Sequence, residues 1–234
     1  MMIDTAIILS GGLGTRLRPL TETTPKPLLP IQGIPMIEHI ILNARKYGVT
    51  RFILSVGYKA EMIKTYFGDG TKWGITISYC VEDTPLGTGG AVREAALGLN
   101  SPFLLMWGDN LHDVHVDLLS STFFSSGCPI AMTLVTREDV ENFGVARVVN
   151  GCVMGFVEKP SRALAPSNLI NAGVFIIDPT VLSMLPAGIC SMEKDCFEKV
   201  AAQGQIAAFV HSGQWFPTDT LEKYEIAGRD FQRK

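Results

Sequence analysis

Several features that would place this chain in a common class of protein are missing from its sequence. No uninterrupted apolar run approaches the ~18 residues that a membrane-spanning helix requires. The first residues, Met1 to Thr5, contain neither a basic region nor a long apolar stretch, so we expect no signal peptide. No block rich in Lys or Arg occurs, and the formal net charge is -3, which argues against nucleic-acid binding. We therefore expect a cytoplasmic protein without membrane or nucleic-acid partners.

Cysteine and histidine residues are few, and their spacing does not indicate a metal site. The five cysteines are scattered and include no Cys-x-x-Cys pair, so we expect reduced thiols rather than a zinc site or disulfides. Of the four histidines, only His112 and His115, on either side of Asp113, lie close together in the sequence. We expect this cluster on a solvated loop, with a metal site as the alternative.

What the sequence does contain is enough apolar material for a large core. The chain has 234 residues, 47% of them hydrophobic, which suits one large α/β domain. Apolar runs alternate with helical patterns in the first half, and this alternation predicts a doubly wound, mostly parallel sheet with crossover helices. The expected strands are 6–9, 51–56, 75–79 and 102–107, and the expected helices are 36–47, 60–67 and 88–97.

The second half of the sequence is less regular. The expected strands are 130–135, 145–149, 153–157, 173–177 and an edge strand at 207–210, with a closing helix at 221–231. The dipeptide Asn150-Gly151 is a turn signal between two of these strands. No repeat or linker divides the chain, so we expect a single domain.

A glycine-rich loop directly follows the first expected strand. Leu9-Ser-Gly-Gly-Leu-Gly-Thr-Arg16 contains three glycines and ends in a cation, and Lys26 follows between two prolines. Glycines let backbone N–H groups turn toward an anion, and the cations supply countercharge for phosphates. In an α/β protein this arrangement indicates a nucleotide-phosphate site, and the alternative is a glycine-rich turn with a surface arginine.

Two widespread phosphate-binding motifs are excluded by single residues. Gly14 is followed by Thr15-Arg16, whereas a P-loop requires Lys and then Ser or Thr. The dinucleotide fingerprint requires a third glycine at position 17, which is Leu17. A nicotinamide-dependent oxidoreductase on a similar sheet is therefore not expected.

A series of segments gives the chain its resemblance to the sugar-1-phosphate nucleotidyltransferases, also called NDP-sugar pyrophosphorylases. In the order of that family, the segments are 9–21 with 25–27, 82–91, 107–110, 143–145, 158–160, 171–174 and 215–220. Each is weak alone, but together they cover nearly the whole chain. The resemblance implies a Rossmann-like nucleotidyltransferase fold. Some relatives carry a C-terminal β-helix, which we do not expect in these 234 residues.

The resemblance also implies a reaction and a division of the chain. A sugar 1-phosphate attacks the α-phosphorus of an NTP in line, giving an NDP-sugar and pyrophosphate. Because two anions must approach each other, catalysis would consist mainly of charge neutralisation and positioning, with Mg²⁺ as cofactor. Within the single domain, 1–234, the part of about 1–115 would bind the nucleotide and the part of about 116–234 the sugar phosphate. Dimers are common in relatives, which leaves a homodimer open.

Four charged residues are the expected catalytic and metal-binding groups. Arg16 would stabilise charge on the phosphates and the leaving pyrophosphate, because its guanidinium suits phosphate oxygens. Lys26 would contact the phosphates from the other side. Asp109, and with it Asp219, would bind Mg²⁺, which takes few protein carboxylates and completes its shell with phosphate oxygens and water. The alternative for either carboxylate is capping of a turn or helix.

The resemblance assigns further residues to the two substrates. Lys159 would bind the sugar phosphate, Glu158 and Asn171 would hydrogen-bond the sugar, and Gly144 would let backbone approach it. The N–H groups of 87–90, at the start of a helix, would face ligand oxygens. The residues expected to bind the nucleotide are Leu9, Gly11, Gly12, Gly14, Thr15, Glu82, Gly87 and Thr88.

The sequence leaves the base and the acceptor open. Glu82 lies where relatives contact the base edge, and a carboxylate suits the two adjacent donors of guanine, which favours GTP. The string 85–91 looks like the mannose- and heptose-phosphate guanylyltransferases, whereas 213–220 also resembles cytidylyl- and thymidylyltransferases, so UTP, CTP and dTTP remain alternatives. Two other readings are a transferase with a non-sugar acceptor and an inactive regulatory subunit. The charged residues that such subunits lose are all present here.

Overall fold

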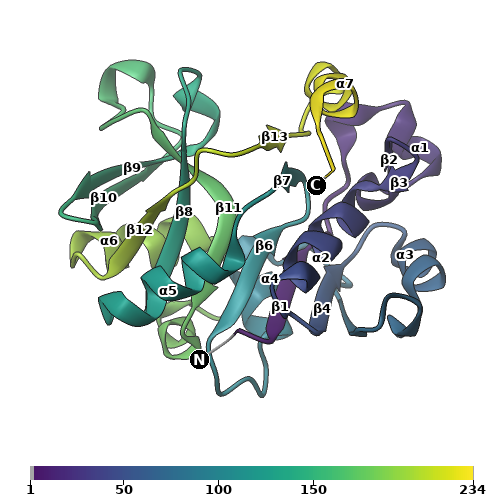
Figure 1. Cartoon of the computed structure of the whole chain (residues 1–234), viewed down its shortest axis with the longest axis horizontal. Coiled ribbons are helices and arrows are strands. Elements are labelled where there is room, and N and C mark those ends of the chain that lie inside the picture. Colours follow the sequence, from purple (N-terminus) through teal and green to yellow (C-terminus); the bar gives the residue numbers. More distant parts are fainter. Residues whose placement is uncertain (1–2, 234) are drawn as a thin grey trace.

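One mixed sheet runs through the whole molecule in a computed structural model, which describes residues 3–233. In this range the sheet has nine strands in the order β5-β4-β1-β6-β11-β8-β12-β10-β9 (Figure 1). Its strands are β1 (Thr5–Leu9), β4 (Arg51–Val56), β5 (Thr76–Val81), β6 (Phe103–Trp107), β8 (Ile130–Thr136), β9 (Gly144–Val149), β10 (Cys152–Glu158), β11 (Leu169–Ile177) and β12 (Ile206–Val210).

The first half of the sheet is parallel, as the alternation of strands and helices predicts. β1 pairs with β4 and β6, and β4 pairs with β5, all in parallel. The crossovers contain α2 (Met36–Lys46), α3 (Ala60–Phe67) and α4 (Gly87–Ala95). Parallel strands share one direction, so the segments that follow β1, β4, β5 and β6 all emerge at the same edge of the sheet. Ligands bind at this edge in open α/β sheets.

The second half is joined mainly by antiparallel pairings. β11 is antiparallel to both β6 and β8, and β10 is antiparallel to β9. The prediction of an edge strand at 207–210 is wrong, because β12 lies between β8 and β10. The helices of the second half of the chain are α5 (Val116–Ser126), α6 (Glu198–Ala202) and α7 (Leu221–Asp230). A π-helical turn, η7 (Met192–Phe197), precedes α6.

Several short elements have no clear sequence signal. The helix α5 was also not expected, and its sequence mixes serine and threonine with its apolar residues. The short strands are β2 (Pro30–Ile31), β3 (Ile34–Pro35), β7 (Asn110–His112) and β13 (Trp215–Pro217), and the short helices are α1 (Leu20–Thr23), η1 (Thr15–Leu17), η2 (Lys26–Leu28), η3 (Thr71–Trp73), η4 (Val140–Asn142), η5 (Arg162–Leu164) and η6 (Pro179–Met184).

The core consists of apolar layers on both faces of the sheet. Consecutive residues of a strand point to opposite faces, so Ile8 packs on the face with α2, α3 and α5, and Ile7 packs on the face with α4 and η7. Both side chains are fully buried. Helices on both faces explain why β1 is a continuous apolar run rather than an alternating one.

A small second sheet brings distant parts of the chain together. β13 pairs antiparallel with β7, with Phe216 opposite Leu111 and Pro217 opposite Asn110. In Figure 1, β13 crosses the middle of the molecule between the part with β9 and β10 and the part that carries α7. This pairing places the segment after β13 beside the segment after β6. Within residues 3–233, no helix combines the length and apolar character needed to cross a bilayer.

Candidate active site

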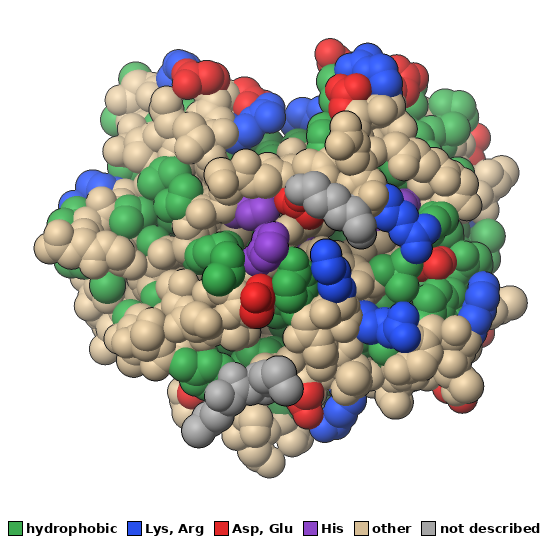
Figure 2. Space-filling model, in the orientation of Figure 1, with side chains coloured by type: hydrophobic (Ala, Val, Ile, Leu, Met, Phe, Trp, Pro, Cys, Tyr) green, Lys and Arg blue, Asp and Glu red, His purple; other side chains and the backbone are tan. Residues whose placement is uncertain are grey.

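A cleft of about 750 Å³ opens where the parallel strands end. It is lined by every residue predicted to bind the nucleotide, together with Lys26 and Asp109: Leu9, Gly11, Gly12, Gly14, Thr15, Glu82, Gly87 and Thr88. The edge of the sheet thus gathers loops that are up to 100 residues apart in sequence. In Figure 2 the molecule is hollowed at the top of the view, between the part with β9 and β10 and the part with α7.

One glycine of the glycine-rich loop has a conformation that other residues rarely adopt. Gly14 has φ +62°, in the left-handed region, and a Cβ there would lie 2.9 Å from Thr21 Cγ2 and 3.2 Å from Lys26 Cβ. The Thr21 hydroxyl donates to the Gly14 carbonyl at 2.9 Å, which fixes the turn. The close approach of Lys26 to this turn explains why the glycine and the lysine occur in one motif.

Lys26 and Asp109 form one ion pair at the cleft. Lys26 Nζ donates to Asp109 Oδ2 at 2.9 Å, and the lysine side chain is only 12% exposed. Gly108 lets the end of β6 lie close to β1, because a Cβ there would be 2.7 Å from the Leu9 carbonyl oxygen. The pair therefore lies on a tightly packed base, with the carboxylate more exposed than the ammonium.

Asp219 is paired with two cations at once. Its Oδ2 accepts from Arg16 Nη1 at 2.7 Å, and its Oδ1 accepts from Lys223 Nζ at 3.0 Å. Burial acts to raise the pKa of Asp219, but the hydrogen bond and charge of Lys223, with the charge of Arg16, outweigh burial and lower it. Asp219 is thus a carboxylate at neutral pH. Arg16 does not line the cleft, and its side chain is 68% exposed.

Hydrogen bonds connect the backbone segments that carry Asp109 and Asp219. The Thr218 N–H and hydroxyl both donate to the Asp109 carbonyl, at 3.1 and 2.7 Å. This contact, with the β7–β13 pairing, joins Asp109 to Asp219 across the chain. Among the residues that the structure describes, no group of three or more His, Cys, Asp or Glu side chains could hold a metal. A cation here would take its remaining ligands from substrate and water.

Gly144 and Glu158, predicted to bind the sugar, meet at one point of the sheet. Gly144 begins β9 and lies opposite Glu158 at the end of β10. A Cβ at Gly144 would collide with the ring of Phe156 and lie 2.9 Å from Glu158 Oε2, so only glycine fits. Glu158 is 14% exposed in its side chain, and its buried Oε2 has no hydrogen-bond partner within the described chain. These residues lie outside the lining of the main cleft.

Lys159 follows Glu158 in a rarely populated backbone conformation. Its φ is +48°, unusual for a residue other than glycine, and its N–H donates to the Phe143 carbonyl at 3.0 Å. Such conformations are found most often at functional sites. Lys159 Nζ lies 3.5 Å from Glu158 Oε1. Burial, and next the charge of Glu193, raises the pKa of Glu158, and the charge of Lys159 only partly offsets this effect.

The Asn171 side chain is held by the backbone two residues further along the same strand. Its Oδ1 accepts from the Gly173 N–H at 2.7 Å, within a bulge of β11. The intervening Ala172 carbonyl accepts from Trp215 Nε1 at 2.8 Å. The amide oxygen is thus engaged locally, which leaves the NH₂ end of Asn171 as the better candidate to reach a ligand.

In the segment 87–90, one of the N–H groups expected to face a ligand is bonded within the protein. The Gly89 N–H donates to the Cys190 carbonyl at 2.9 Å, so it does not face a ligand. A Cβ at Gly87 would collide with the same carbonyl, and one at Gly90 would lie 2.8 Å from the Gly188 carbonyl oxygen. The prediction that all these N–H groups point toward ligand oxygens is wrong. The glycines make room for the segment 188–192 behind the loop.

Sequence reasoning missed three residues that orient the predicted ones. Ser55, fully buried on β4, donates to Glu82 Oε1 at 2.7 Å. Glu193 accepts from Thr88, and Lys223 pairs with Asp219. A spacing of four residues between Asp219 and Lys223 at the start of a helix was the one available signal. Ser55 and Glu193 lie in segments without any motif.

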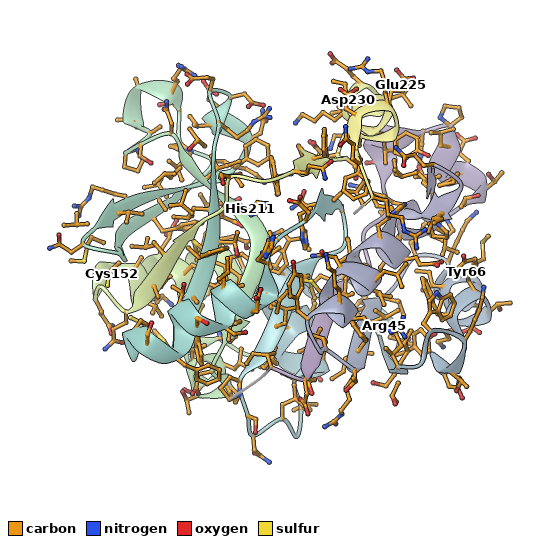
Figure 3. All side chains as sticks on the ribbon, viewed as in Figure 1. Arg45, Tyr66, Cys152, His211, Glu225 and Asp230 are labelled. Carbon is orange, nitrogen blue, oxygen red and sulfur yellow. The ribbon has the colours of Figure 1, made fainter. Side chains whose placement is uncertain are left out.

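The expectation of a solvated loop is wrong for His112, whereas His115 is exposed and lies outside the strands. His112 lies on β7 and is 2% exposed, and burial lowers its pKa to about 3. His211, labelled in Figure 3, bonds Asp113 Oδ1 through Nε2 at 3.0 Å. His112 and His115 line a separate cavity of about 260 Å³ next to α2. The sequence could not show this, because burial follows from the pairing with β13.

Comparison with known proteins identifies the family. The profile of the Nucleotidyl transferase family matches residues 5–233, so the chain belongs to that family. A mannose-1-phosphate guanylyltransferase of Mycobacterium tuberculosis is 33% identical over 233 residues, which is 97% of this chain and 64% of that protein. The chain thus spans less than two thirds of that relative.

Two further similarities extend over whole chains. A D-glycero-alpha-D-manno-heptose 1-phosphate guanylyltransferase of Aneurinibacillus thermoaerophilus is 32% identical and covers 97% of this chain and 98% of its own. The crystal structure of HddC from Yersinia pseudotuberculosis complexed with GMP-PN is 28% identical, with a TM-score of 0.81, and the match covers 98% of this chain and 100% of that one. The Rossmann-like nucleotidyltransferase fold expected from the sequence is confirmed.

Proposed function

We propose that this protein is a Mg²⁺-dependent sugar-1-phosphate nucleotidyltransferase that joins GTP to a mannose- or heptose-type sugar 1-phosphate and releases pyrophosphate. One observation carries the proposal. Asp109 pairs with Lys26 at the glycine-rich cleft, and Asp219, which pairs with Arg16 and Lys223, directly follows Thr218, which bonds the Asp109 carbonyl. Two carboxylates among three cations suit a reaction between two phosphates, and they give no support to hydride transfer or acyl transfer.

The cations would lower the repulsion between the substrates. Lys26 is nearly buried and already oriented, so it suits a fixed contact with the NTP phosphates. Arg16 is exposed, and an exposed ion pair contributes only about 0–1 kcal/mol. Arg16 can therefore turn from Asp219 to the phosphates at small cost, and its guanidinium can hold two oxygens. The attacking phosphate is already ionised at neutral pH and needs no general base.

Asp109 and Asp219 fit a magnesium ion. Both offer hard oxygen ligands, and Thr218, next to Asp219, is hydrogen-bonded to the Asp109 carbonyl. When bound, the ion would neutralise phosphate charge in the transition state. The cations Lys223 and Arg16 lower the pKa of Asp219 against the effect of burial, so this carboxylate is ionised and ready for that role.

The sugar phosphate would occupy the space beside β9, β10 and β11. Lys159 would bind its phosphate, and Glu158 would accept from a sugar hydroxyl with the oxygen that lacks a protein partner. A buried carboxylate oxygen without a donor is costly unless a ligand supplies one. Asn171 would donate from its amide, and Gly144 would bring backbone close to the sugar.

The choice of GTP follows from the orientation of Glu82. Ser55 and the Leu86 N–H hold one oxygen each, at 2.7 and 3.3 Å, so the carboxylate is fixed as an acceptor in the cleft. Guanine has two adjacent donors that such an acceptor would bind. The guanylyltransferase names of the similar proteins support the same base. UTP, CTP and dTTP are the alternatives.

We also infer the organisation around this reaction. The part of about 1–115 would bind the nucleotide, and the part of about 116–234 would bind the sugar phosphate, within a single domain. We infer a cytoplasmic protein, and the proposed NTP substrate supports this location. The homodimer that the resemblance leaves open is tested by measuring the molar mass in solution.

A turnover assay tests the proposal directly. Pyrophosphate release is measured with Mg²⁺ for GTP, UTP, CTP, dTTP and ATP against a panel of hexose and heptose 1-phosphates. Release with GTP and a mannose- or heptose-type substrate is the expected result. Release with another pair would correct the base or the sugar. No release from folded protein that still binds an NDP-sugar would contradict the proposal and favour a regulatory subunit.

A further inference from the structure

Glu193 is a buried carboxylate to which the reaction described above gives no role. It lies on the π-helical turn η7 and is 8% exposed. Turns of this kind are rare and often occur at functional sites. Buried carboxylates are retained only where they have specific partners. The partners of Glu193 therefore show what it does.

The first partner is Thr88 on the nucleotide side of the cleft. The Thr88 hydroxyl donates to Glu193 Oε2 at 2.6 Å, and the Ser191 hydroxyl donates to the same oxygen at 2.7 Å. The Thr88 oxygen in turn accepts from the Met192 N–H at 2.9 Å. Hydrogen bonds to an ionised acceptor are short and strong. The Thr88 side chain, which lines the cleft, is thus fixed in one orientation by η7.

The surrounding backbone joins the two segments into one unit. The Cys190 N–H donates to the Leu86 carbonyl at 3.0 Å, and the Cys190 carbonyl accepts from the Gly89 N–H at 2.9 Å. A Cβ at Gly89 would lie 2.8 Å from Cys190 Sγ and 3.1 Å from the Met192 nitrogen. Because no space separates the two segments, a displacement of η7 must displace the nucleotide loop with it.

The turn η7 also adjoins the sugar side. The Glu158 N–H donates to Glu198 Oε1 at 3.3 Å, and Glu198 begins α6 directly after η7. The charge of Glu193 acts on the Glu158 carboxyl and, after burial, is the largest cause that raises its pKa. The other charged groups that face Glu158 are Lys159, which lowers its pKa, and Glu198, which raises it. Glu193 therefore affects a residue proposed to bind the sugar without contacting the nucleotide.

We propose that Glu193 is a positioning residue that fixes Thr88 for the nucleotide, on a turn whose following helix bonds Glu158 of the sugar site. This inference rests on the proposed function, which assigns Thr88 and Glu158 to the two substrates. The charge of Glu193 acts on Glu158 as a second effect, which can be tested separately.

The nucleotide arm is tested by a double-mutant cycle in direct binding. Glu193→Leu and Thr88→Val each remove the hydrogen bond, and we expect each to weaken GTP binding at least tenfold. If Glu193 acts through Thr88, the double variant is no weaker than either single variant. Thr88→Ser keeps the hydroxyl and restores GTP affinity to within about threefold of the original chain. Additive losses in the double variant would overturn this arm.

The sugar arm is tested by Glu193→Gln. This change keeps an acceptor for Thr88 and Ser191 but removes the charge, so the pKa of Glu158 falls. The acid limb of the pH profile for sugar 1-phosphate binding then moves to lower pH, while GTP affinity falls only a few-fold. Lys194→Gln, an exposed charge change on the same turn, is the matched control and leaves both affinities unchanged. An unmoved acid limb would overturn this arm.

Measuring dissociation constants separates this inference from the proposed function. Absence of turnover in the original chain would reject the transferase proposal, and the binding cycle would still report on Thr88 and Glu193. Conversely, normal turnover with additive losses would reject only the link through Glu193. Thermal unfolding of each variant identifies a change that merely prevents folding.

Discussion

The two sides of the proposed site are built in opposite ways. The nucleotide side consists of loops that follow neighbouring parallel strands, each contributing a short, contiguous segment. The sugar side takes single residues from the start of β9, the end of β10 and the middle of β11, which are antiparallel. Neighbouring parallel strands end at the same edge of the sheet, so the loops that follow them lie close together. Residues on antiparallel strands lie close together only if the register of the pairing places them opposite one another.

This difference also appears in the charges. On the nucleotide side, Lys26 and Asp109 satisfy each other, and each is ready for a phosphate or a metal. On the sugar side, Glu158 has one oxygen without a protein partner and a raised pKa. The nucleotide side thus contains an ion pair whose charges neutralise each other, and the sugar side contains a carboxylate oxygen without a hydrogen-bond donor. Substitutions on the two sides should therefore affect different constants, and the predictions below use this contrast.

Loss of Asp109 should have the largest effect. Asp109→Ala removes a metal ligand and leaves Lys26 without its partner, so we expect kcat/KM to fall by about 10³-fold or more. Asp109→Asn, which keeps the shape but not the charge, should be nearly as inactive. Steady-state kinetics with saturating Mg²⁺ measures both. Activity within tenfold of the original chain would show that Asp109 is not a metal ligand.

The sequence predicted which residues gather at this cleft, for the same reason. The glycine-rich loop, Glu82 and Asp109 follow the parallel strands β1, β5 and β6, so their convergence follows from the topology, and Lys26 lies further along the segment after β1. By contrast, Ser55 and Glu193 act on predicted residues from behind the cleft and are ordinary in sequence. The edge position expected for 207–210 and the solvated loop expected at His112 were wrong, because both depend on which strands pair.

Asp219 allows a sharper comparison, because two of its contacts are cations of different kinds. Arg16→Ala removes the exposed guanidinium that would move to the phosphates, so kcat should fall by about 10²–10³-fold. Lys223→Ala removes the cation that fixes Asp219 and should cost about tenfold or less. It should also raise the pKa of Asp219, so that activity is lost at a higher pH on the acid side. Equal losses in kcat would show that both cations only orient Asp219.

Lys159 should affect one substrate alone. Lys159→Ala removes a charged donor to the sugar phosphate, which is worth about 1.5–3 kcal/mol, so KM for the sugar 1-phosphate should rise about tenfold to a hundredfold. KM for GTP should stay within about twofold, since Lys159 lies outside the lining of the nucleotide cleft. Initial rates with each substrate varied in turn measure both constants. A parallel rise in both would show that the two sides are not separate.

Glu158 should give the smallest effect, one visible in stability rather than in rate alone. Its pKa is raised above the ordinary value of 4.5, first by burial and then by the charge of Glu193. Between the unfolded and the folded pKa, folding takes up a proton, so this carboxyl lowers stability as pH rises through that window. Below the window both states are protonated and the penalty is absent.

Glu158→Gln removes this titration while keeping the shape of the side chain. We therefore expect the melting temperature of the variant, relative to that of the original chain, to be higher at pH 7 than at pH 4. Sugar 1-phosphate binding should weaken at the same time, because the amide replaces one acceptor oxygen with a donor. Thermal unfolding at the two pH values measures the difference. An equal difference in melting temperature at both pH values would show that folding does not raise the pKa of Glu158. The contrast between the nucleotide side and the sugar side would then rest on Lys159 alone.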